Sequence, residues 1–376
     1  MSCISRRGLP AQALDSGRTF SETLLSDKLE RPWGRNVLNF DEQRFLGIQS
    51  GAVALAGEFD GIVGEALRDG VTNVHFLGTG GVALLLQPAV QLLSRRSTFP
   101  VFSDRVAETM AAGSVNLNEG SLVFLASLSG TTRESVAFLE YAKARKAKVV
   151  TLVGHADTPL GRDADHALVN YAADDTSSES FYIQSLLAAL SLMGHRGELG
   201  TLGDFDGLVQ GMQALPRSLL AVKQAIEPKA NDLARIVSGS DWHIFTGAGN
   251  VWPQAYYYGM CILEEMQWIR TRPVHASDFF HGTLELLEEG VSVVLLKGED
   301  ESRPLAERVE RFVPKVGGAL TVLDTADYAT PDLSPVLRSL LAPALLATML
   351  ERVSAHLEVL RDHPLTTRRY YRRVEY

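Results

Sequence analysis

Short apolar runs alternate along this chain with turns rich in glycine, serine or threonine and with segments of helical periodicity. In the first half, the pattern predicts strands at Val74–Leu77, Pro100–Ser103, Leu122–Ala126 and Lys148–Val153. It predicts helices after the first three of these strands, at Val82–Leu93, Val106–Ala112 and Glu134–Lys146. Strands that alternate with helices indicate βαβ units, and therefore a parallel sheet with helices on both faces.

The same alternation returns after a mostly helical connector at residues 200–240. Strands are expected at His243–Thr246, Val291–Lys297 and Ala319–Asp324, and helices at 253–269, at 303–313 and near the C-terminus. We therefore predict an α/β protein with two tandem domains, each a doubly wound, mainly parallel sheet flanked by helices. The predicted divisions are an N-terminal arm at 1–44, a first domain at 45–205, connector helices and a second domain at 206–362, and a basic tail at 363–376. The arm is expected to pack loosely on the surface or to wrap a partner subunit.

The composition excludes several classes of function. The chain has 376 residues and a net charge of −9, so we expect no basic face for nucleic acid. Its longest apolar runs, such as Leu340–Leu350, are shorter than the ~20 residues that span a bilayer, and no apolar segment follows Arg6 and Arg7 to form a secretory signal. Its cysteines, Cys3 and Cys261, cannot build a disulfide framework. These features predict a cytoplasmic protein that binds neither nucleic acid nor membrane.

The turn after Leu122–Ala126 carries four hydroxyl groups in six residues, Ser127-Leu128-Ser129-Gly130-Thr131-Thr132. If a helix begins near Thr132, its free N–H groups and positive dipole end face this turn, where the hydroxyls can donate to the same anion. The alternative is a helix cap that binds no ligand, but one hydroxyl is enough for a cap. The turn therefore predicts a phosphate site.

The turn after Val74–Leu77 has two interpretations. Its sequence, Gly78-Thr79-Gly80-Gly81-Val82-Ala83, fits the dinucleotide fingerprint G-x-G-x-x-A, and Asp104 lies near where an acid for the ribose is expected. This motif is weak in isolation, and the second hydroxyl-rich turn has no task in a dinucleotide fold. The two turns together would instead form one monophosphate pocket at the carboxyl ends of their strands, which is the interpretation we favour.

Candidate acid–base groups lie in the second half. The predicted helix at 253–269 carries Glu264 and Glu265, and at most one of them can face a given cleft, because neighbours on a helix point about 100° apart. A carboxylate among the aromatic residues of this helix would have the raised pKa of a general base, although periodicity alone favours a solvated face. His281, sixteen residues after Glu265, is either an acid–base group or a core histidine. The sequence contains neither a zinc motif nor a nucleophile elbow.

At these residues the chain resembles the sugar isomerase (SIS) family, phosphosugar-binding α/β domains that often occur in tandem. The similarity spans residues 45–376, and its most widely shared motif is Leu125–Ser135 (LASLSGTTRES). The segments at 261–290, 297–303 and 361–376 look most like the branch that cleaves 6-phosphorylated Amadori compounds, the fructosamine-6-phosphate deglycases. The chain is also similar to the isomerase half of glucosamine-6-phosphate synthase.

The resemblance implies a role for each candidate residue. In these families a glutamate precedes the H-G histidine by sixteen residues, which implies that Glu265 is the base and His281 the acid or ring-opening group. The implied substrate-binding residues are Ser127, Ser129 and Thr132 at the phosphate, Thr79 and Gly80 opposite them, and Ser177, Ser178 and Glu179 in a turn that lines the sugar. The resemblance also implies a homodimer with sites at the subunit boundary, where His281 serves the neighbouring chain. No metal or redox cofactor is expected.

Some departures from these families narrow the prediction. Gly80 stands where the family commonly has a hydroxyl, and H-G-P has become His281-Gly282-Thr283. The chain lacks both the glutaminase cysteine just after Met1 and a tail lysine, its last lysine being Lys315, so we do not expect ammonia-transferring synthesis. We predict hydrolysis of fructosamine 6-phosphates to glucose 6-phosphate and a free amine or amino acid. The alternatives are a cofactor-free aldose–ketose phosphosugar isomerase and a non-catalytic sugar-phosphate sensor.

Overall fold

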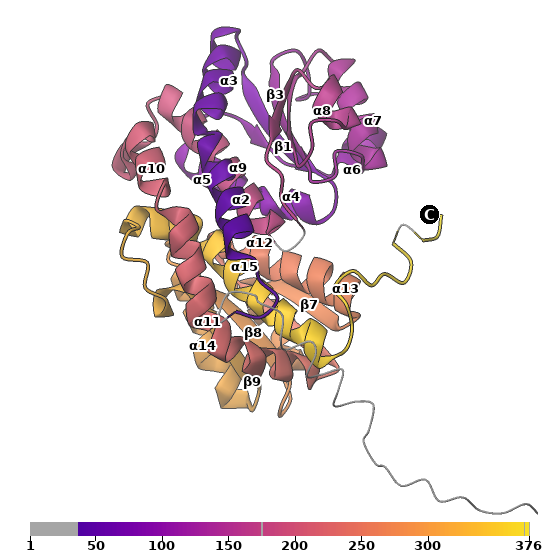
Figure 1. The fold of residues 1–376 in the computed structure, drawn as a ribbon, viewed down its shortest axis with the longest axis vertical. Coiled ribbons are helices and arrows are strands. Elements are labelled where there is room, and N and C mark those ends of the chain that lie inside the picture. The colour runs from indigo at the N-terminus through magenta and orange to yellow at the C-terminus, as the bar shows by residue number, and fades with distance from the viewer. Residues whose placement is uncertain (1–36, 174–175, 372, 376) are drawn as a thin grey trace, which may run out of the picture.

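Two parallel β-sheets, one in each half of the chain, form the framework of the protein (Figure 1). The computed structural model describes residues 37–173, 176–371 and 373–375. Most of the predicted N-terminal arm, residues 1–36, therefore lies outside the described residues. Helices cover both faces of the first sheet and flank the second, so the predicted α/β class with two tandem, doubly wound sheets is confirmed.

The first sheet has the strand order β2-β1-β3-β4-β5, with every neighbouring pair parallel. Its strands are β1 Asn73–Gly78, β2 Val101–Phe102, β3 Ser121–Ser127, β4 Lys148–Val153 and β5 His166–Val169. Strands β1 and β3 are buried along their whole length, because helices on both faces leave neither side of the sheet in solvent. The four predicted strands are confirmed, and β5 is an edge strand that the apolar pattern missed.

The helices of the first half divide between the two faces of this sheet. They are α2 Glu42–Ala54, α3 Ala56–Arg68, α4 Gly81–Leu85, α5 Gln87–Arg96, α6 Val106–Ala112, α7 Arg133–Lys143, α8 Pro159–Asp163 and α9 Ser177–His195. Phe76 and Phe124 pack on the side of α2, α3 and α9, whereas the alternate residues Leu77 and Leu125 pack on the side of α6, α7 and α8. The single helix predicted at Val82–Leu93 is wrong, because the chain turns at Leu86 to form α4 and α5.

The second sheet has the strand order β7-β6-β8-β9, again fully parallel. Its strands are β6 Trp242–Gly247, β7 Arg270–His275, β8 Ser292–Lys297 and β9 Ala319–Asp324. Its helices and those of the connector are α10 Phe205–Met212, α11 Leu215–Ser238, α12 Trp252–Tyr257, α13 Glu265–Gln267, α14 Arg303–Phe312 and α15 Pro335–Leu360. The three predicted strands are confirmed, and β7 is a further strand that was not predicted.

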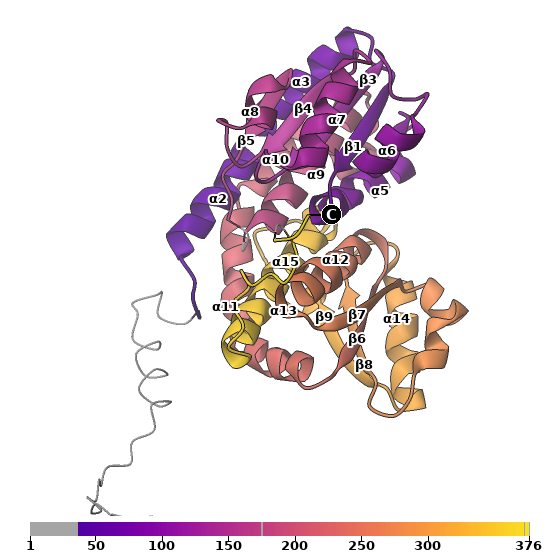
Figure 2. The same cartoon turned by 90° about the vertical axis from the view of Figure 1, so that its right-hand side faces the viewer.

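Three long helices join the two halves. Helix α15 packs against both α11 and α9, so the last long helix of the second half touches the first half directly. Figure 2 shows α15 between the two sheets, with the C-terminal tail running from its end toward the first half. Among the described residues, no helix combines the length and apolar character that crossing a membrane requires.

Candidate active site

The turn after β3 leads directly into α7. Ser127 ends β3, and Thr132 is the residue before the first turn of α7. The Ser127 and Thr132 hydroxyl oxygens lie 3.3 Å apart, and Ser129 Oγ accepts from the backbone N–H and the hydroxyl of Thr131. Gly130 has a φ of +63°, and a Cβ there would lie 2.2 Å from Thr158 Oγ1, so this turn requires glycine. The predicted hydroxyl cluster at a helix N-terminus is therefore formed.

The turn after β1 lies beside it, because β1 and β3 are neighbours in the sheet. Thr79 Oγ1 is 3.0 Å from the hydroxyl oxygen of Ser135, which is buried in α7. Gly80 is exposed, with a φ of +63°, and precedes α4. The carboxyl ends of two adjacent strands thus bring together both predicted turns, as expected for a parallel sheet.

The helix that carries Glu265 packs against this first-half turn. A Cβ on Gly81 would lie 2.7 Å from Cys261 Sγ, so the Cys261 side chain packs directly against the backbone of Gly81. Burial, together with the negative charges of Glu265 and Glu264, raises the pKa of the Cys261 thiol to about 12. Glu265 is therefore close to Cys261, and Cys261 is in turn close to the turn with Thr79 and Gly80.

An irregular helix positions Glu265. The single helix predicted at 253–269 is instead α12, a π-helical segment η3 at Tyr258–Glu264, and the short α13. Trp268 ends this run in the left-handed conformation, with a φ of +57°. Glu264 points to Thr271, whose hydroxyl and backbone N–H donate to it over 2.6 Å and 3.2 Å. Glu264 thus binds Thr271 at the start of β7, whereas Glu265 faces the C-terminal tail.

The tail reaches Glu265 through an arginine. Arg368 Nε donates to Glu265 Oε1 over 2.8 Å, and the side chain of Glu265 is 32% exposed. The other end of the guanidinium donates to the carbonyl oxygens of Leu365 and Thr367, which fixes the tail as a turn. The basic tail, which the sequence left as a possible solvated end, is in direct contact with the candidate base.

Two cavities adjoin at the tail. The first, which we call the loop cavity, has a volume of about 870 Å³ and is lined by Thr79, Thr131, Thr132 and Tyr371 among others. The second, the Glu265 cavity, has a volume of about 880 Å³ and is lined by Glu265 and by the same Tyr371. The two cavities thus share Tyr371 of the tail as a lining residue.

His281 lies elsewhere on the single chain. It ends the short 3₁₀ segment η4, Asp278–His281, and is exposed, as is Gly282 after it. Thr283 is buried and accepts from Arg272 Nε over 3.2 Å, which ties this segment to β7. His281 lines neither the loop cavity nor the Glu265 cavity. The core-histidine interpretation is therefore wrong, and the chain does not bring His281 and Glu265 together on its own.

The implied sugar-lining turn at Ser177–Glu179 is wrong as a turn, because these residues form the first turn of α9. Ser178 and Glu179 line a cavity of about 280 Å³ together with Ile262 and Met266, which flank Glu265 on its helix. Burial raises the pKa of the fully buried Glu179, while Lys223 opposes this shift. Lys223 Nζ lies 3.7 Å from Glu179 and 2.5 Å from Glu351, so this acid belongs to a buried ionic cluster.

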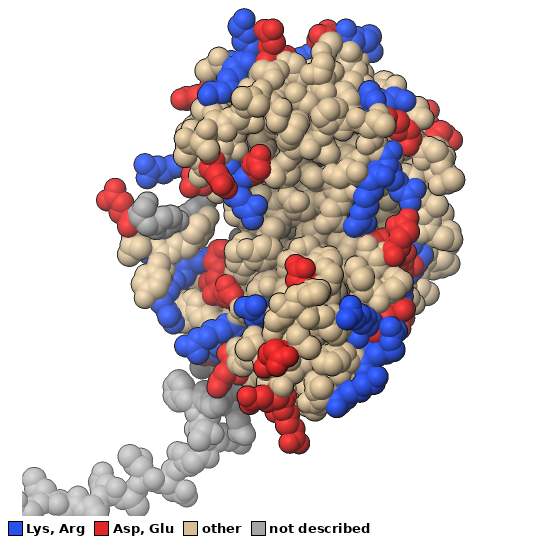
Figure 3. Space-filling view, turned by 180° about the vertical axis from the view of Figure 1, so that it is seen from behind, with Lys and Arg blue, Asp and Glu red and all other residues tan. Residues whose placement is uncertain are grey.

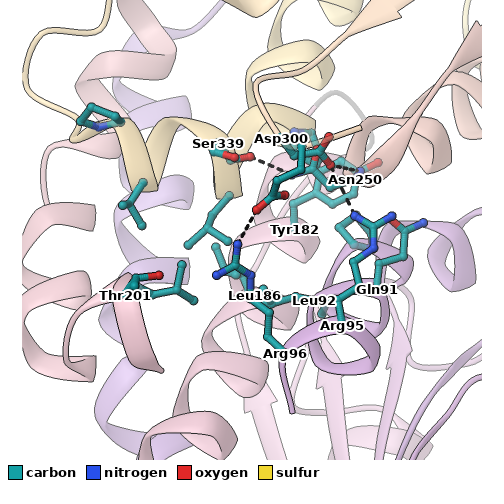
Figure 4. Close-up of a pocket in the computed structure, with 18 residues that line it drawn as sticks. Gln91, Leu92, Arg95, Arg96, Tyr182, Leu186, Thr201, Asn250, Asp300 and Ser339 are labelled. Carbon is teal, nitrogen blue, oxygen red and sulfur yellow. Dashed lines mark hydrogen bonds and ion pairs between the residues drawn. The ribbon is translucent and has the colours of Figure 1, made fainter. Parts of the chain in front are cut away.

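The turn after β6, which corresponds in strand order to the turn after β1, is occupied by a side chain of the protein. After β6, the backbone N–H of Asn250 donates to Asp300 Oδ2 over 2.8 Å, and a Cβ on Gly249 would lie 2.1 Å from that oxygen. Figure 4 shows Arg95 of α5 reaching toward Asp300 from the first half, at a distance of 3.9 Å. The backbone N–H of Asn250 in the turn after β6 is thus already paired within the protein.

Sequence reasoning missed several residues of this region. Two of them, Arg133 and Ser135, lie on α7 directly after the hydroxyl turn. The turn itself has no basic residue, and Arg133 adds a positive charge to the lining of the loop cavity. Arg368 and Tyr371 were left within an unassigned basic tail, although their position beside Glu265 depends on long-range folding. In the part of the chain that the structure describes, no three His, Cys, Asp or Glu side chains are grouped to hold a metal ion.

Comparison with known proteins identifies the family. A model of the SIS domain matches residues 73–194. Fructosamine deglycase FrlB of Bacillus subtilis (strain 168) is 32% identical over 311 residues, which are 81% of this chain and 93% of that protein. The chain belongs to the SIS-domain family that includes this deglycase.

Other relatives agree with this family. Fructoselysine 6-phosphate deglycase of Escherichia coli (strain K12) is 27% identical over 310 residues, 82% of this chain and 88% of that protein. The solved C-terminal domain of glucosamine-fructose-6-phosphate aminotransferase from Francisella tularensis has a TM-score of 0.74 and covers 86% of this chain and 95% of its own. At 14% identity, this structure shows the shared fold alone. The resemblance to SIS proteins and their deglycase branch is confirmed.

Proposed function

We propose that this protein is a fructosamine-6-phosphate deglycase. The reaction adds one water to an N-(1-deoxyfructosyl) amine 6-phosphate and yields glucose 6-phosphate and the free amine or amino acid. The names of the two deglycase relatives support this substrate class. The observation that carries the proposal is the packing of the Thr79–Gly81 turn against the helix of Glu265, because it joins an anion site to a carboxylate.

The hydroxyl cluster would bind the phosphate. Ser127, Ser129 and Thr132 lie at the N-terminus of α7, whose free N–H groups and dipole favour an anion, and Thr79 and Gly80 form the opposite wall. Phosphate binding far from the reacting carbon contributes to positioning, so the binding energy lowers the barrier instead of only tightening the complex.

Glu265 would act as the base. It removes a proton from C1, the C2 carbonyl accepts the electron pair, and a 1,2-enaminol forms. Return of a proton to C2 gives an aldimine at C1, which water hydrolyses to the aldehyde and the free amine. The contact with Arg368 holds the carboxylate in one orientation in the free enzyme. No step of this sequence requires a metal or a redox cofactor.

His281 would act in the active site of a second copy of the chain. The exposed ring is free to enter a neighbouring site, and the ties of its segment to β7 keep it in place. We propose a homodimer in which each imidazole opens the sugar ring and exchanges protons with the ring or C2 oxygen in the other subunit. Two-fold symmetry then completes both sites at once.

The direct test supplies 6-phosphorylated fructosyl amino acids and measures glucose 6-phosphate and free amine. Glu265→Gln and His281→Ala should each lower turnover by about 10²–10⁴-fold, the usual contribution of general acid–base groups. Glu264→Gln is the matched control, because Thr271 holds this carboxylate away from Glu265 and an amide oxygen can still accept from it. Near-normal activity of both site variants contradicts the assignment, and conversion of substrate without amine release indicates an isomerase instead.

Mixing the two inactive variants tests the shared site. A hybrid dimer of Glu265→Gln and His281→Ala chains has one site with both groups intact, so an equal mixture that exchanges subunits should recover about a quarter of the normal activity. If His281 serves its own chain, every site in the mixture lacks one group and no activity returns.

A further inference from the structure

The outer surface gives little indication of a large charged partner. Acidic and basic side chains are interspersed on the face of the molecule that Figure 3 shows, so this face favours neither a polyanion nor a polycation. A cavity at the boundary between the two halves, by contrast, has a lining that is specific enough to define a small ligand.

This cavity, which we call the boundary cavity, has a volume of about 310 Å³. Its walls come from α5 and α9 of the first half and from α15 and the turns after β6 and β8 of the second half. Among the described residues, it shares no lining residue with the loop cavity, with the Glu265 cavity or with the cavity at Ser178 and Glu179. Its volume is within the range of small-molecule sites, about 300–1,000 Å³. The proposed reaction leaves this cavity without a role.

The boundary cavity lies at the carboxyl ends of two neighbouring strands. Asn250 belongs to the turn after β6, and Asp300 belongs to the turn after β8. Because β7 lies on one side of β6 and β8 on the other, the strand order reverses between β6 and β8, and open parallel sheets bind ligands at such a point. In the first half, the turns after β1 and β3 occupy the same place. The position therefore predicts a ligand, and the lining indicates which kind.

Two buried acceptor atoms in this lining lack a hydrogen-bond partner within the described residues. They are Gln91 Oε1 and Asn250 Oδ1. The amide nitrogen of Asn250 donates to the carbonyl oxygen of Ser339 over 2.7 Å, so the amide oxygen is the atom left for a ligand. A buried acceptor without a donor is destabilising, and both oxygens therefore indicate a ligand that donates hydrogen bonds. Because the carboxylate of Asp300 lies beside Asn250, a positively charged donor is favoured over a neutral one.

A cation lies next to these acceptors. Arg95 is four residues after Gln91 and therefore on the same face of α5. Its ion pair with Asp300 is 3.9 Å long, which exceeds a hydrogen bond, and no hydrogen bond of its guanidinium is found within the described residues. The guanidinium can thus donate to a carboxylate of a ligand. Figure 4 shows Gln91, Arg95, Asn250 and Asp300 together on one side of the cavity.

The remaining lining is mostly apolar. It consists largely of aliphatic side chains from both halves of the chain, which are Leu92, Leu186, Leu202, Val336, Leu340 and Pro343. An apolar group of a ligand is stabilised against such a wall by the hydrophobic effect. The cavity therefore offers acceptors for a cation, a donor for an anion and an apolar surface within one small volume.

We propose that the boundary cavity binds a free α-amino acid with an apolar side chain. The ammonium group donates to Gln91 Oε1 and Asn250 Oδ1, and the carboxylate accepts from Arg95. The side chain of the amino acid lies against the aliphatic residues. A zwitterion suits this cavity because one small molecule then supplies the missing donors and the missing acceptor. The inference goes beyond the proposed deglycase function and does not depend on it, because the cavity contains none of the residues assigned to that reaction.

Isothermal titration calorimetry of the full-length protein with L-leucine tests this site in the absence of any sugar phosphate. One leucine should bind per chain. Gln91→Leu should raise the Kd of leucine by roughly tenfold to hundredfold, the effect of a hydrogen bond to a charged group. Gln224→Leu, at an exposed position of α11, is the matched control and should leave this Kd unchanged. Gln91→Leu should remain folded, because it removes a buried acceptor that has no partner among the described residues, and circular dichroism verifies this.

Two analogues of leucine test the two ends of the ligand. Leucinamide lacks the carboxylate and isocaproate lacks the ammonium group, so both should bind the unaltered protein at least about tenfold more weakly than leucine does. Arg95→Gln should raise the Kd of leucine toward that of leucinamide and should not weaken the binding of leucinamide. Arg311→Gln, at an exposed ion pair of α14, is the matched control and should change neither Kd.

Three results would overturn the proposal. The first is that the unaltered protein binds no leucine at millimolar concentrations. The second is an equal affinity for leucine and for both analogues, because the zwitterion then has no advantage. The third is an unchanged affinity for leucine in both Gln91→Leu and Arg95→Gln, which indicates that leucine binds elsewhere on the protein. None of these results changes the outcome of the deglycase assay, so the two proposals fail separately.

Discussion

Replacing Thr132 by valine tests whether the turn after β3 binds the phosphate. Valine has the shape of threonine without the hydroxyl, and within the described residues the Thr132 side chain makes no capping hydrogen bond to α7. Among the described residues, the variant loses the 3.3 Å contact between the Thr132 and Ser127 hydroxyl oxygens, so the fold should be retained. The change therefore removes one donor from the proposed anion site and little else.

The expected size follows from the charge of the ligand. A hydrogen bond to a charged group contributes about 1.5–3 kcal/mol, which corresponds to a roughly tenfold to hundredfold change in a binding constant. We expect the inhibition constant of glucose 6-phosphate to rise by this factor in Thr132→Val. The inhibition constant is preferable to KM, because it reports binding without a contribution from the chemical step.

Thr131 provides the matched control. Its hydroxyl donates to Ser129 Oγ over 3.2 Å and is thus already used within the turn. Thr131→Val should raise the inhibition constant much less than Thr132→Val. Two results would refute the assignment of the phosphate to Ser127, Ser129 and Thr132. The first is an equal rise of the inhibition constant in both variants. The second is an unchanged inhibition constant in both, provided that each variant unfolds at the same urea concentration as the unaltered protein.

Three further predictions concern stability, measured by urea unfolding. Lys223→Met should lower the free energy of unfolding by about 3–5 kcal/mol, because it leaves buried carboxylates without their cation. Lys146→Met, at an exposed ion pair, should change it by no more than about 0.5 kcal/mol. Equal losses in the two variants would contradict the role of burial. Gly130→Ala should lower the free energy of unfolding by about 1–2 kcal/mol, because alanine disfavours the left-handed backbone at this position. It should also weaken glucose 6-phosphate binding, and an unchanged affinity would contradict the phosphate site at this turn. Burial opposes ionisation of Glu227, yet hydrogen bonds from a histidine and an arginine of α15 lower its pKa from 4.5 to about 2. Its stabilisation is therefore complete above about pH 4.5 and is lost as the pH falls toward 2, and Glu227→Gln should lack this part of the acid sensitivity.

The central strands of the fold were predictable because their signals are local. Leu122–Ala126 is an uninterrupted apolar run between turn residues, as a strand buried on both faces must be, and it lies within β3. β7 has the opposite character, since Arg270, Arg272 and Pro273 interrupt any apolar pattern. It is tolerated because it is the edge strand of its sheet, where proline and exposed charges do no harm.

The candidate site was predictable only where its residues are close in sequence. The hydroxyl turn and its helix lie within one short segment, so spacing alone indicated an anion site. The contact between Arg368 and Glu265 joins residues 103 positions apart, and no periodicity could indicate it. The π-helical segment before Glu265 also has no sequence period of its own, so the helix there was predicted as regular.

The carboxylate of Asp300 makes the turns of the two halves differ in their capacity to bind an anion. By accepting from the N–H of Asn250, it supplies the turn after β6 with an internal anion, so this N–H is not available to a second phosphate. Under the proposed function, the phosphate therefore binds in the first half, and Glu265 and His281 of the second half supply the acid–base groups. A saturating titration with a sugar phosphate would accordingly end at a stoichiometry of one molecule per polypeptide.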